Sequence, residues 1–424
     1  METLWAGNAG IMAEADSYNF TSVIDEAKIS GQQWLVLLVS LFTAMFDGYD
    51  TQGIAYVAPV MAKDLGFGPA LLGPIFSSGL LGLTLGALFF GMLADKFGRR
   101  PVLMIDILLF SALELASAFA PSLPVLLALR AAFGFAMGGE WGIGASLTME
   151  TVKPEARGLV SGLLQSGYPS GYLIASVAFA LLYPHLGWRG MFMIGILPAL
   201  LILYIRRSVP ESPGWNRERT SAATILNVLA RHWQLALYAI LLMTAFNFFS
   251  HGTQDLYPTF LQKQHHFVPA TVGTIAVLYN IGAILGGLSF GAFSQSFGRR
   301  RTMMLCALFA LPAIWLWAFS ETALLLAVGA FLVQFFVQGA WGVVPAHLNE
   351  LSPPEARGTF PGTVYQLGNF IASYNAVLQA RIAESHGNNY SLALSGVAIA
   401  AALAVMLLAF LGREAREIDM VVKG

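Results

Sequence analysis

Three strongly polar side chains follow one another at four-residue spacing in the stretch NFFSHGTQDLYPT, residues 247–259. Asn247, His251 and Asp255 are successive i, i+4 neighbours, so a helix would place them on one face. Histidine changes charge near physiological pH, and an ionisable side chain inside a bilayer is a functional candidate because its burial is costly. The pattern predicts proton binding and release. A purely structural His251–Asp255 hydrogen bond near the outer surface is the alternative.

A second acidic cluster lies in MFDGYDTQG, residues 45–53. Asp47 and Asp50 are three residues apart, which places them on neighbouring parts of one helix face. Two nearby carboxylates in a low dielectric cannot both ionise cheaply, so we expect one of them to hold a proton until the site meets water. The alternative is a polar cluster that caps a helix broken at Gly48.

Arg130 is the only lysine or arginine in an apolar run that lies away from a helix end. Its guanidinium needs an anion, which could be a substrate carboxylate or one of Asp47, Asp50 and Glu140. Direct substrate binding and a structural or proton-coupling role therefore both stay open. The residues expected to bind substrate are Arg130, Glu140, Tyr49, Asn247 and Gln254. Asp106 and Glu114 are left out of the site as candidates for hydrogen bonds between helices.

The composition of the 424-residue chain indicates a lipid environment. Hydrophobic residues make up 56% of the sequence, charged residues only 11%, and the mean hydropathy is +0.66. A water-soluble globule of this size needs more polar surface. Apolar runs long enough to cross a bilayer, about 20 residues each, lie at 34–60, 71–94, 101–120, 123–148, 158–183, 188–206, 233–262, 270–294, 302–319, 321–348, 358–382 and 390–412. The sequence thus predicts an all-α polytopic membrane protein with twelve transmembrane helices.

An internal repeat relates the first six runs to the last six. GMLADKFGRRPVLM at 91–104 aligns with GAFSQSFGRRRTMM at 291–304 at a shift of 200, and PEARG occurs at both 154–158 and 354–358. Six is an even number, so both halves enter and leave on the same side and form a parallel repeat about the membrane normal. We expect a central path between the halves. The predicted domains are a terminal segment over 1–33, six-helix halves over 34–207 and 233–412, a linker over 208–232 and a tail over 413–424.

The distribution of basic residues predicts the orientation. Eighteen Lys and Arg residues lie near helix ends on one predicted side and four on the other. Loops rich in Lys and Arg remain cytoplasmic, so both termini and the linker are expected there, in the cytoplasmic (inner) membrane. The first 33 residues lack a basic start followed by an apolar core, so no cleaved signal peptide is predicted, and either Met1 or Met12 could be the start.

The repeated motifs resemble those of the major facilitator superfamily, and the resemblance covers nearly the whole chain. GMLADKFGRR at 91–100 resembles its signature between helices 2 and 3, RAAFGFAMGGEWG from Arg130 its helix 4 motif, and VPESPGW at 209–215 the segment after helix 6. Glu150 and Arg157, separated by six residues, recur as Glu350 and Arg357, which resembles the family's cytoplasmic charge-relay pairs.

The resemblance implies a gate of ion pairs that latches one conformation, with arginines that only fix topology as the alternative. Gln295 at the position equivalent to Asp95 predicts a weaker second latch. The residues expected in the gate are Asp95, Arg99, Arg100, Glu150, Arg157, Arg299, Arg300, Glu350 and Arg357.

Residues 247–259 resemble, position by position, the helix 7 signature of lactate/pyruvate–proton symporters, a branch near the sialate–proton symporters. The signature is Asn-x-x-Ser/Thr-His-x-Ser/Thr-Gln-Asp-x-x-x-Thr, and it is matched by Asn247, Ser250, His251, Thr253, Gln254, Asp255 and Thr259. The Asp-Gly-x-Asp pattern at 47–50 resembles helix 1 of aromatic-acid–proton symporters. The resemblance implies proton-coupled uptake of a monocarboxylate such as lactate or pyruvate, with Asp47, Asp50, His251 and Asp255 in proton coupling.

Several alternatives remain beside monocarboxylate symport. The substrate could be sialic acid or an aromatic acid, and the chain could be an antiporter or a transporter-like substrate sensor. An enzyme is not expected, because the sequence contains no nucleotide-binding loop, nucleophile elbow or metal-ligand spacing. A single cysteine and a net charge of −1 give no indication of a disulfide, a metal or nucleic acid. The expected partners are a small organic anion, protons and membrane lipid, for a carrier that works as a monomer without a cofactor.

Overall fold

The computed structural model describes residues 29–66, 72–215 and 222–416, together with residues 418 and 420. Met1, Met12 and most of the predicted N-terminal segment lie outside the described residues, as do parts of the linker and of the tail. Within the described ranges every regular element is a helix, which confirms the predicted fold class.

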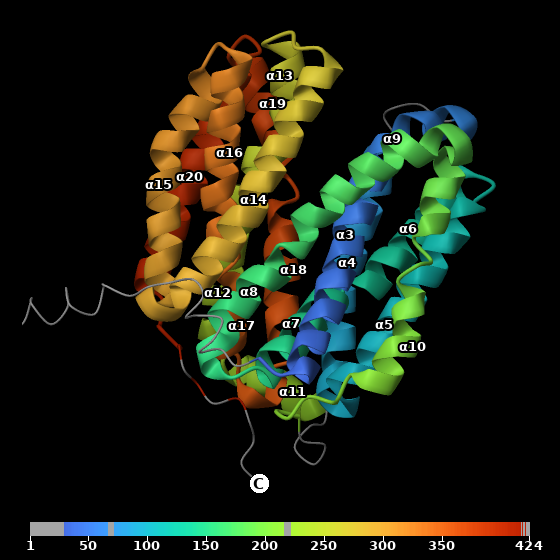
Figure 1. Cartoon of the computed structure of the whole chain (residues 1–424), viewed down its shortest axis with the longest axis vertical. Coiled ribbons are helices and arrows are strands. Elements are labelled where there is room, and N and C mark those ends of the chain that lie inside the picture. Colours follow the sequence, from blue (N-terminus) through green and yellow to red (C-terminus); the bar gives the residue numbers. More distant parts are fainter. Residues whose placement is uncertain (1–28, 67–71, 216–221, 417, 419, 421–424) are drawn as a thin grey trace, which may run out of the picture.

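The N-terminal half comprises six membrane crossings, drawn from blue to light green in Figure 1. Gly187, with a φ of 61°, interrupts α9 so that its last residues join α10 in the sixth crossing. The crossings are α3 (Gly31–Asp64), α4 (Leu72–Phe97), α5 (Arg99–Ala118), α6 with α7 (Leu123–Met137, Glu140–Thr151), α8 with α9 (Arg157–Gln165, Gly167–Ile194), and α10 (Ala199–Ser208).

The C-terminal half repeats this order, including a break within its fourth crossing. Short 3₁₀ turns stand at equivalent positions, η2 (Pro154–Ala156) and η4 (Pro354–Ala356), and α11 (Ala222–Arg231) connects the halves. The crossings are α12 with α13 (Trp233–Gln254, Tyr257–Lys263), α14 (Pro269–Phe297), α15 (Arg299–Phe319), α16 with α17 (Ala323–Trp341, Val344–Leu351), α18 with α19 (Phe360–Ala372, Asn375–Ser385), and α20 (Tyr390–Leu411).

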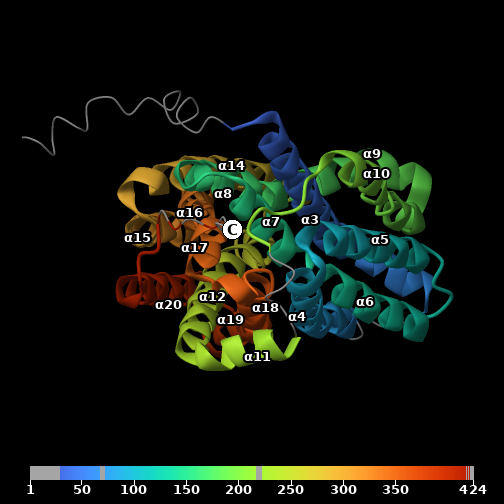
Figure 2. The same cartoon turned by 90° about the horizontal axis from the view of Figure 1, so that it is seen from below.

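The two halves pack together at one end, which carries Arg99, Arg157, Arg299 and Arg357 and is called here the arginine-rich end. Toward the other end the halves diverge (Figure 1). Viewed from the arginine-rich end, α8 lies beside α14 and α4 beside α18 (Figure 2). Glycines allow the approach of α8 to α14, since a Cβ on Gly291 would lie 2.5 Å from the Gly162 Cα.

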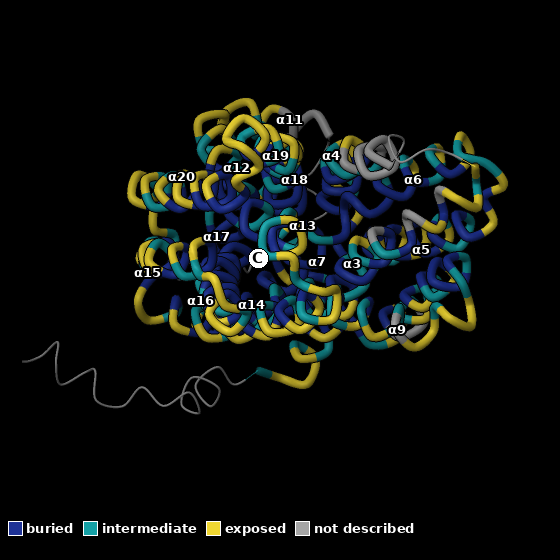
Figure 3. Tube along the Cα trace, turned by 90° about the horizontal axis from the view of Figure 1, so that it is seen from above, coloured by how far each residue is buried: buried dark blue, intermediate teal, exposed yellow. Residues whose placement is uncertain are grey.

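The outer surface is apolar, as expected of a protein surrounded by lipid. Exposed residues form the rim of the molecule in Figure 3, whereas the inner helix faces are buried. Among the exposed side chains are Leu181, Trp315, Leu324 and Phe410, each more than 60% exposed. Eight helical stretches among the described residues are long and apolar enough to span a membrane on their own. The chain is a multi-pass membrane protein.

Candidate functional site

A central cavity lies between the two halves. One part of it is lined by Asp47, Trp141 and Tyr168 of the N-terminal half and by Asn247, Ser250, His251, Gln254, Gln338, Trp341 and Tyr365 of the C-terminal half. An adjoining part of about 310 Å³ shares Asp47 and His251 and adds Asp50, Arg130, Tyr172 and Asp255. The structure therefore brings together all four side chains predicted to bind protons.

Helix α3 carries its two aspartates without a break. It is helical from Gly31 to Asp64, so the alternative of a helix broken at Gly48 is wrong. Gly48 instead provides a close helix contact, since a Cβ there would lie 3.2 Å from the Gly171 Cα of α9. The uninterrupted helix holds Asp47 and Asp50 at fixed depth along the cavity wall.

On the facing wall, α12 presents the histidine and its acidic neighbour near its end. His251 Nδ1 lies 3.1 Å from Asp255 Oδ1, and the two side chains are 34% and 36% exposed. Asn247, one turn earlier, is buried, and its amide donates to the Met243 carbonyl at 2.8 Å. The predicted shared face of α12 exists, and its pair of titratable groups is open to water in the cavity.

Arg130 is held by two carboxylates rather than standing free for an anion. Its Nη1 lies 3.3 Å from Asp50 Oδ1, its Nη2 forms an ion pair with Glu114, and the same Nη2 donates to Ser117 Oγ at 2.9 Å. Arg130 is only 3% exposed, and its guanidinium stacks 4.2 Å from the Phe133 ring centroid. Of the internal partners considered from the sequence, Asp50 is the one that the structure pairs with Arg130.

The contact of Glu114 with Arg130 is the hydrogen bond between helices expected of this glutamate, and it is also an ion pair. The sequence did contain a signal for an ion pair here, because Glu114 stands alone in the middle of an apolar run and a buried carboxylate requires a counter-charge. Its partner could not be chosen from the sequence, since α5 and α6 carry no spacing rule that relates residue 114 to residue 130.

Amide side chains cover the C-terminal wall of the cavity. Gln254 Nε2 donates to Gln334 Oε1 at 2.7 Å, Gln334 Nε2 to Thr253 Oγ1 at 2.9 Å, and Gln338 Nε2 to Ser250 Oγ at 3.1 Å. Gln338 lines the cavity, with Gln334 bonded to the lining residue Gln254, and neither glutamine of α16 is among the residues expected in the site. Their spacing of four residues in an apolar run places them on one helix face and was the signal that could have found them.

An aromatic cluster forms part of the cavity lining. The Tyr365 ring centroid lies 4.6 Å from that of Trp141 and 5.7 Å from that of Trp341. The two tryptophans occupy equivalent positions of the repeat, so the cluster combines both halves. It offers flat apolar surface next to the charged groups.

Two residues predicted to bind substrate lie elsewhere. Tyr49 is buried in the core with Val57, and its hydroxyl donates to the Met191 carbonyl at 3.1 Å. Glu140, at the start of α7, is 2% exposed and does not line the central cavity. Each lies on a face of its helix that packs against a neighbouring helix.

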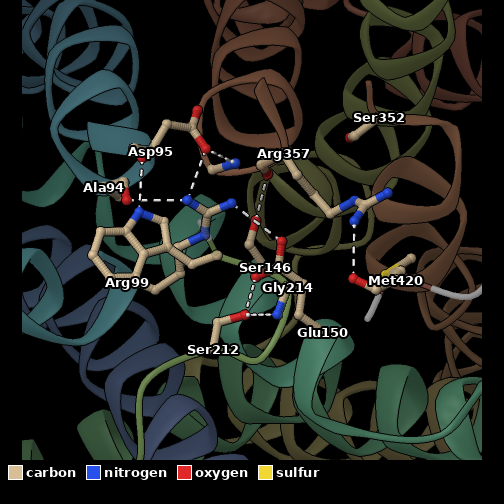
Figure 4. Close-up of polar contacts among 12 residues, drawn as sticks. Ala94, Asp95, Arg99, Ser146, Glu150, Ser212, Gly214, Ser352, Arg357 and Met420 are labelled. Atoms are coloured by element: carbon tan, nitrogen blue, oxygen red, sulfur yellow. Dashed lines mark hydrogen bonds and ion pairs between the residues drawn. The ribbon is translucent and has the colours of Figure 1, made fainter. Parts of the chain in front are cut away.

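A network of polar contacts joins the halves at the arginine-rich end (Figure 4). The Asp95 carboxylate accepts hydrogen bonds from Gly358 N at 2.8 Å and from Thr359 N and Oγ1 at 2.9 and 2.6 Å. It also pairs with Arg99 at 2.8 Å, and Arg99 pairs with Glu150 at 3.1 Å. Asp95, Arg99 and Glu150 are buried, so the charges are shielded from water.

The second repeat forms a similar junction with an amide in place of the aspartate. Gln295 Oε1 accepts a hydrogen bond from Gly158 N at 3.0 Å. Arg299 donates to Gln295 at 2.9 Å and to both oxygens of Glu350 at 3.0 Å. Gln295 thus accepts one hydrogen bond from the opposite half where Asp95 accepts three.

The remaining arginines expected in the gate contact main-chain carbonyls. Arg157 donates to Met149 O at 3.1 Å and to Ile418 O at 2.5 Å, and Arg357 donates to Met420 O at 3.5 Å. The ion pair of Glu150 is with Arg99 and that of Glu350 is with Arg299, which revises the pairing suggested by the recurring Glu and Arg spacing. The guanidinium groups of Arg100 and Arg300 donate to carbonyls of α10 and α20.

Comparison with known proteins supports this architecture. The profile of the Major Facilitator Superfamily matches residues 40–267 and 240–419. A carboxylic acid transporter protein homolog of Saccharomyces cerevisiae is 30% identical over 342 residues, which cover 72% of this chain and 55% of the yeast protein. The sialic acid transporter NanX of Escherichia coli is 28% identical over 384 residues, which cover 87% of this chain and 93% of NanX.

A further relative and a solved structure agree with these matches. The 4-hydroxybenzoate transporter PcaK of Pseudomonas aeruginosa is 25% identical over 440 residues, covering 94% of this chain and 96% of PcaK. The proton:xylose symporter XylE, solved with 6-bromo-6-deoxy-D-glucose, has a TM-score of 0.72 at 18% identity over 93% of this chain and 99% of that chain, a likeness of fold. These relatives are transporters of small organic molecules, and none is named as an enzyme. The chain belongs to the Major Facilitator Superfamily and is a membrane transporter.

Proposed function

We propose that this chain is a proton-coupled symporter that takes up a small organic anion, with a monocarboxylate such as lactate or pyruvate as the leading substrate class. The observation that carries the proposal is the central cavity, where Asp47, Asp50, His251 and Asp255 from both halves lie beside Arg130. In this proposal the arginine-rich end faces the cytoplasm, the protein lies in the cytoplasmic membrane, and the packing of the halves at that end corresponds to the outward-open state.

Arg130 supplies a route from protonation to anion binding. Its single positive charge faces two carboxylates, Asp50 and Glu114, so no charge is left over for a substrate anion. A proton on Asp50 cancels one of these negative charges. A substrate carboxylate can then take the place of Asp50 on the guanidinium Nη1, while Glu114 remains on Nη2.

Charge balance favours moving the proton and the anion together. Moving one net charge against the membrane potential costs about 2.3 kcal/mol per 100 mV, whereas a proton and a monocarboxylate cross as a neutral pair. His251 and Asp255 offer a second proton-binding pair on the opposite wall, with Asn247 and Gln254 as neutral polar neighbours. Binding of protons and substrate to both walls of the cavity draws the halves together around the cavity. This movement breaks the junction at the arginine-rich end.

An aromatic acid is the second candidate substrate. Trp141, Trp341 and Tyr365 provide ring faces within the cavity, against which a planar acid would stack. The Asp-Gly-x-Asp pattern at 47–50 and the similarity to PcaK favour the same class. A sialic acid, as in NanX, would have to place a much larger polar body in the same space.

Uptake by the purified protein in proteoliposomes tests the proposal. Labelled lactate should accumulate when the outside is more acidic than the lumen, and a protonophore should abolish the accumulation. Competition by pyruvate, 4-hydroxybenzoate and sialic acid then ranks the substrate classes. Binding of an acid without accumulation would identify a sensor, and uptake driven by exit of a second solute would identify an antiporter; either result refutes symport.

A further inference from the structure

Buried acids continue from the central cavity into the N-terminal half. Asp47 on α3 lines the cavity, Glu140 at the start of α7 is 2% exposed, and Asp106 on α5 is completely buried. Among the described residues, none of the three forms an ion pair. The proposed symport uses only Asp47, so Glu140 and Asp106 are titratable groups without an assigned role.

The three acids lie at decreasing distance from the arginine-rich end. Asp47 is sixteen residues beyond Gly31, where α3 begins, Glu140 precedes Thr151 by eleven residues, and Asp106 follows Arg99 by seven. At a rise of 1.5 Å per residue these offsets correspond to about 24, 16 and 10 Å along the helices. The acids therefore form a descending series from the cavity toward the arginine-rich end.

Buried hydroxyl groups accompany the acids along the contact of α3 with α7. The Ser40 hydroxyl donates to Gly144 O at 3.3 Å, and Thr148 Oγ1 donates to Ser40 Oγ at 3.0 Å. Gly144 leaves room beside them, since a Cβ on it would lie 3.5 Å from Ser40 Oγ and 3.9 Å from Glu140 Oε1. The Glu140 carboxyl and the Ser40 hydroxyl thus share one small polar space.

Asp106 is the most unusual member because neither of its carboxyl oxygens has a hydrogen-bond partner. The charge of Glu140 acts electrostatically on Asp106, and that of Asp47 on Glu140. An ionised carboxylate without a partner is expensive in an apolar core, so this site tolerates a neutral acid that carries a proton. Its surroundings on α5 and α7 are apolar, including Leu103, Ile107 and Ile143.

The repeat provides an internal control for packing. At the shift of 200, the positions of Asp47, Glu140 and Asp106 are occupied by Asn247, Ala340 and Cys306. The hydroxyl positions of Ser40 and Thr148 are likewise occupied by Ile240 and Leu348. The C-terminal half forms the same helices without these acids and hydroxyls, so the fold does not require them.

From these observations we infer that Glu140 and Asp106 are a proton relay, which carries the coupling proton from Asp47 through the N-terminal half toward the arginine-rich end, apart from the path of the substrate. The inference rests on the proposed symport. In each step one proton moves: the O–H bond of the Asp47 acid breaks as an O–H bond forms on ionised Glu140, and Asp47 is left ionised. The O–H bond of the Asp106 acid breaks as an O–H bond forms on water that enters from the arginine-rich end, and the ionised Asp106 is then reprotonated by Glu140. The buried junction of Asp95, Arg99 and Glu150 can therefore stay closed to the substrate while the proton leaves.

Asp106→Asn and Glu140→Gln test the relay in two transport assays. Gradient-driven accumulation needs net proton release, whereas counterflow with equal pH on both sides exchanges substrate without it. We expect both variants to lose accumulation by about tenfold or more, because a proton-transfer group typically contributes at least that much, while counterflow stays within about twofold of wild type. Cys306→Ser, at the equivalent position of the C-terminal half, should change neither assay, and Asp106→Glu should restore accumulation.

The outcomes separate the relay from the proposed function. Wild-type accumulation in both Asp106→Asn and Glu140→Gln would overturn the relay and leave symport intact. Loss of counterflow together with accumulation in both variants, and in Asp106→Glu, would assign these residues to substrate binding or packing and would also overturn it. A wild-type protein that exchanges acids but never accumulates them in a proton gradient would refute symport itself.

Discussion

At the scale of single residues, charge compensation distinguishes two kinds of site in the cavity. Arg130 is buried between Asp50 and Glu114, whereas His251 and Asp255 are about one third exposed and bonded to each other. The buried guanidinium of Arg130 becomes available to another anion when one of its two carboxylates loses its charge. In the proposed symport Asp50 provides this response, because a proton on its carboxylate leaves the guanidinium of Arg130 available to an anion. The exposed pair of His251 and Asp255 can exchange protons with water directly.

The pair on α12 yields a prediction at this scale. His251→Ala and Asp255→Asn should each abolish proton-driven accumulation, since each removes a titratable group from the cavity, and membrane insertion should remain intact. Uptake of labelled lactate in proteoliposomes, with protein amount measured by immunoblot, provides the measurement. His386→Ala, an exposed histidine after α19, is the matched control. Wild-type accumulation in either α12 variant would exclude that residue from the coupling site.

At the scale of elements, the two repeats close the arginine-rich end with unequal strength. The last turn of α4 bonds across the junction through Asp95, which accepts three hydrogen bonds from Gly358 and Thr359. The last turn of α14 uses Gln295, which accepts one from Gly158. Hydrogen bonds to a charged group are stronger than those to a neutral amide, so the Asp95 junction should dominate the closed state.

This asymmetry predicts opposite effects of two matched substitutions. Asp95→Asn should destabilise the closed junction by about 1–3 kcal/mol, because it removes the charge that Arg99 and the Thr359 donors face. Gln295→Glu should stabilise it, since Arg299 and Gly158 N then face a carboxylate. The readout is labelling of Ser146→Cys, at the buried junction, by a membrane-impermeant thiol reagent in a Cys306→Ser background.

Faster labelling in Asp95→Asn and slower labelling in Gln295→Glu are the expected results. Equal labelling rates in both variants and in the parent protein would show that Asp95 and Gln295 do not hold the gate. Counterflow activity of each variant verifies that it is folded.

At the scale of the whole molecule, residues 418 and 420 of the tail contact both halves at the arginine-rich end. Arg157 of the N-terminal half and Arg357 of the C-terminal half donate to the carbonyls of Ile418 and Met420. Met420 is 2% exposed and packs with Val152 and Ala346, which come from opposite halves. These contacts join the two halves at this end, so we expect them to add to the stability of the closed state.

The tail contacts predict that truncation of Met420 and truncation of Ile418 have different effects on stability. Met420→Ala should lower thermal stability in detergent by about 2–5 kcal/mol, as expected for truncation of a buried side chain, and should speed labelling at Ser146→Cys. Ile418→Ala is the matched control, because that side chain is 41% exposed and a change there should stay within about 0.5 kcal/mol. Equal melting and labelling in the two variants would show that Met420 does not hold the junction.

The sequence by itself determined the twelve helices, their division into two sixes and the family. Backbone polar groups in lipid must be satisfied within a helix, so apolar runs such as 302–319 and 390–412 have one available structure. The repeat at a shift of 200 then related the halves. The four-residue spacing of Asn247, His251 and Asp255 also predicted that they share one helix face, since that relation depends only on helical periodicity.

Only the tertiary structure decided which side chains meet across helices. Glu114 reaches Arg130, Glu150 reaches Arg99, and Tyr49 turns into the core, although nothing in their local spacing distinguishes these outcomes. Periodicity describes one helix at a time, whereas partners from different helices depend on rotation and depth set by packing along the whole chain. For the same reason the acids of α3, α5 and α7 form a descending series that no single segment reveals.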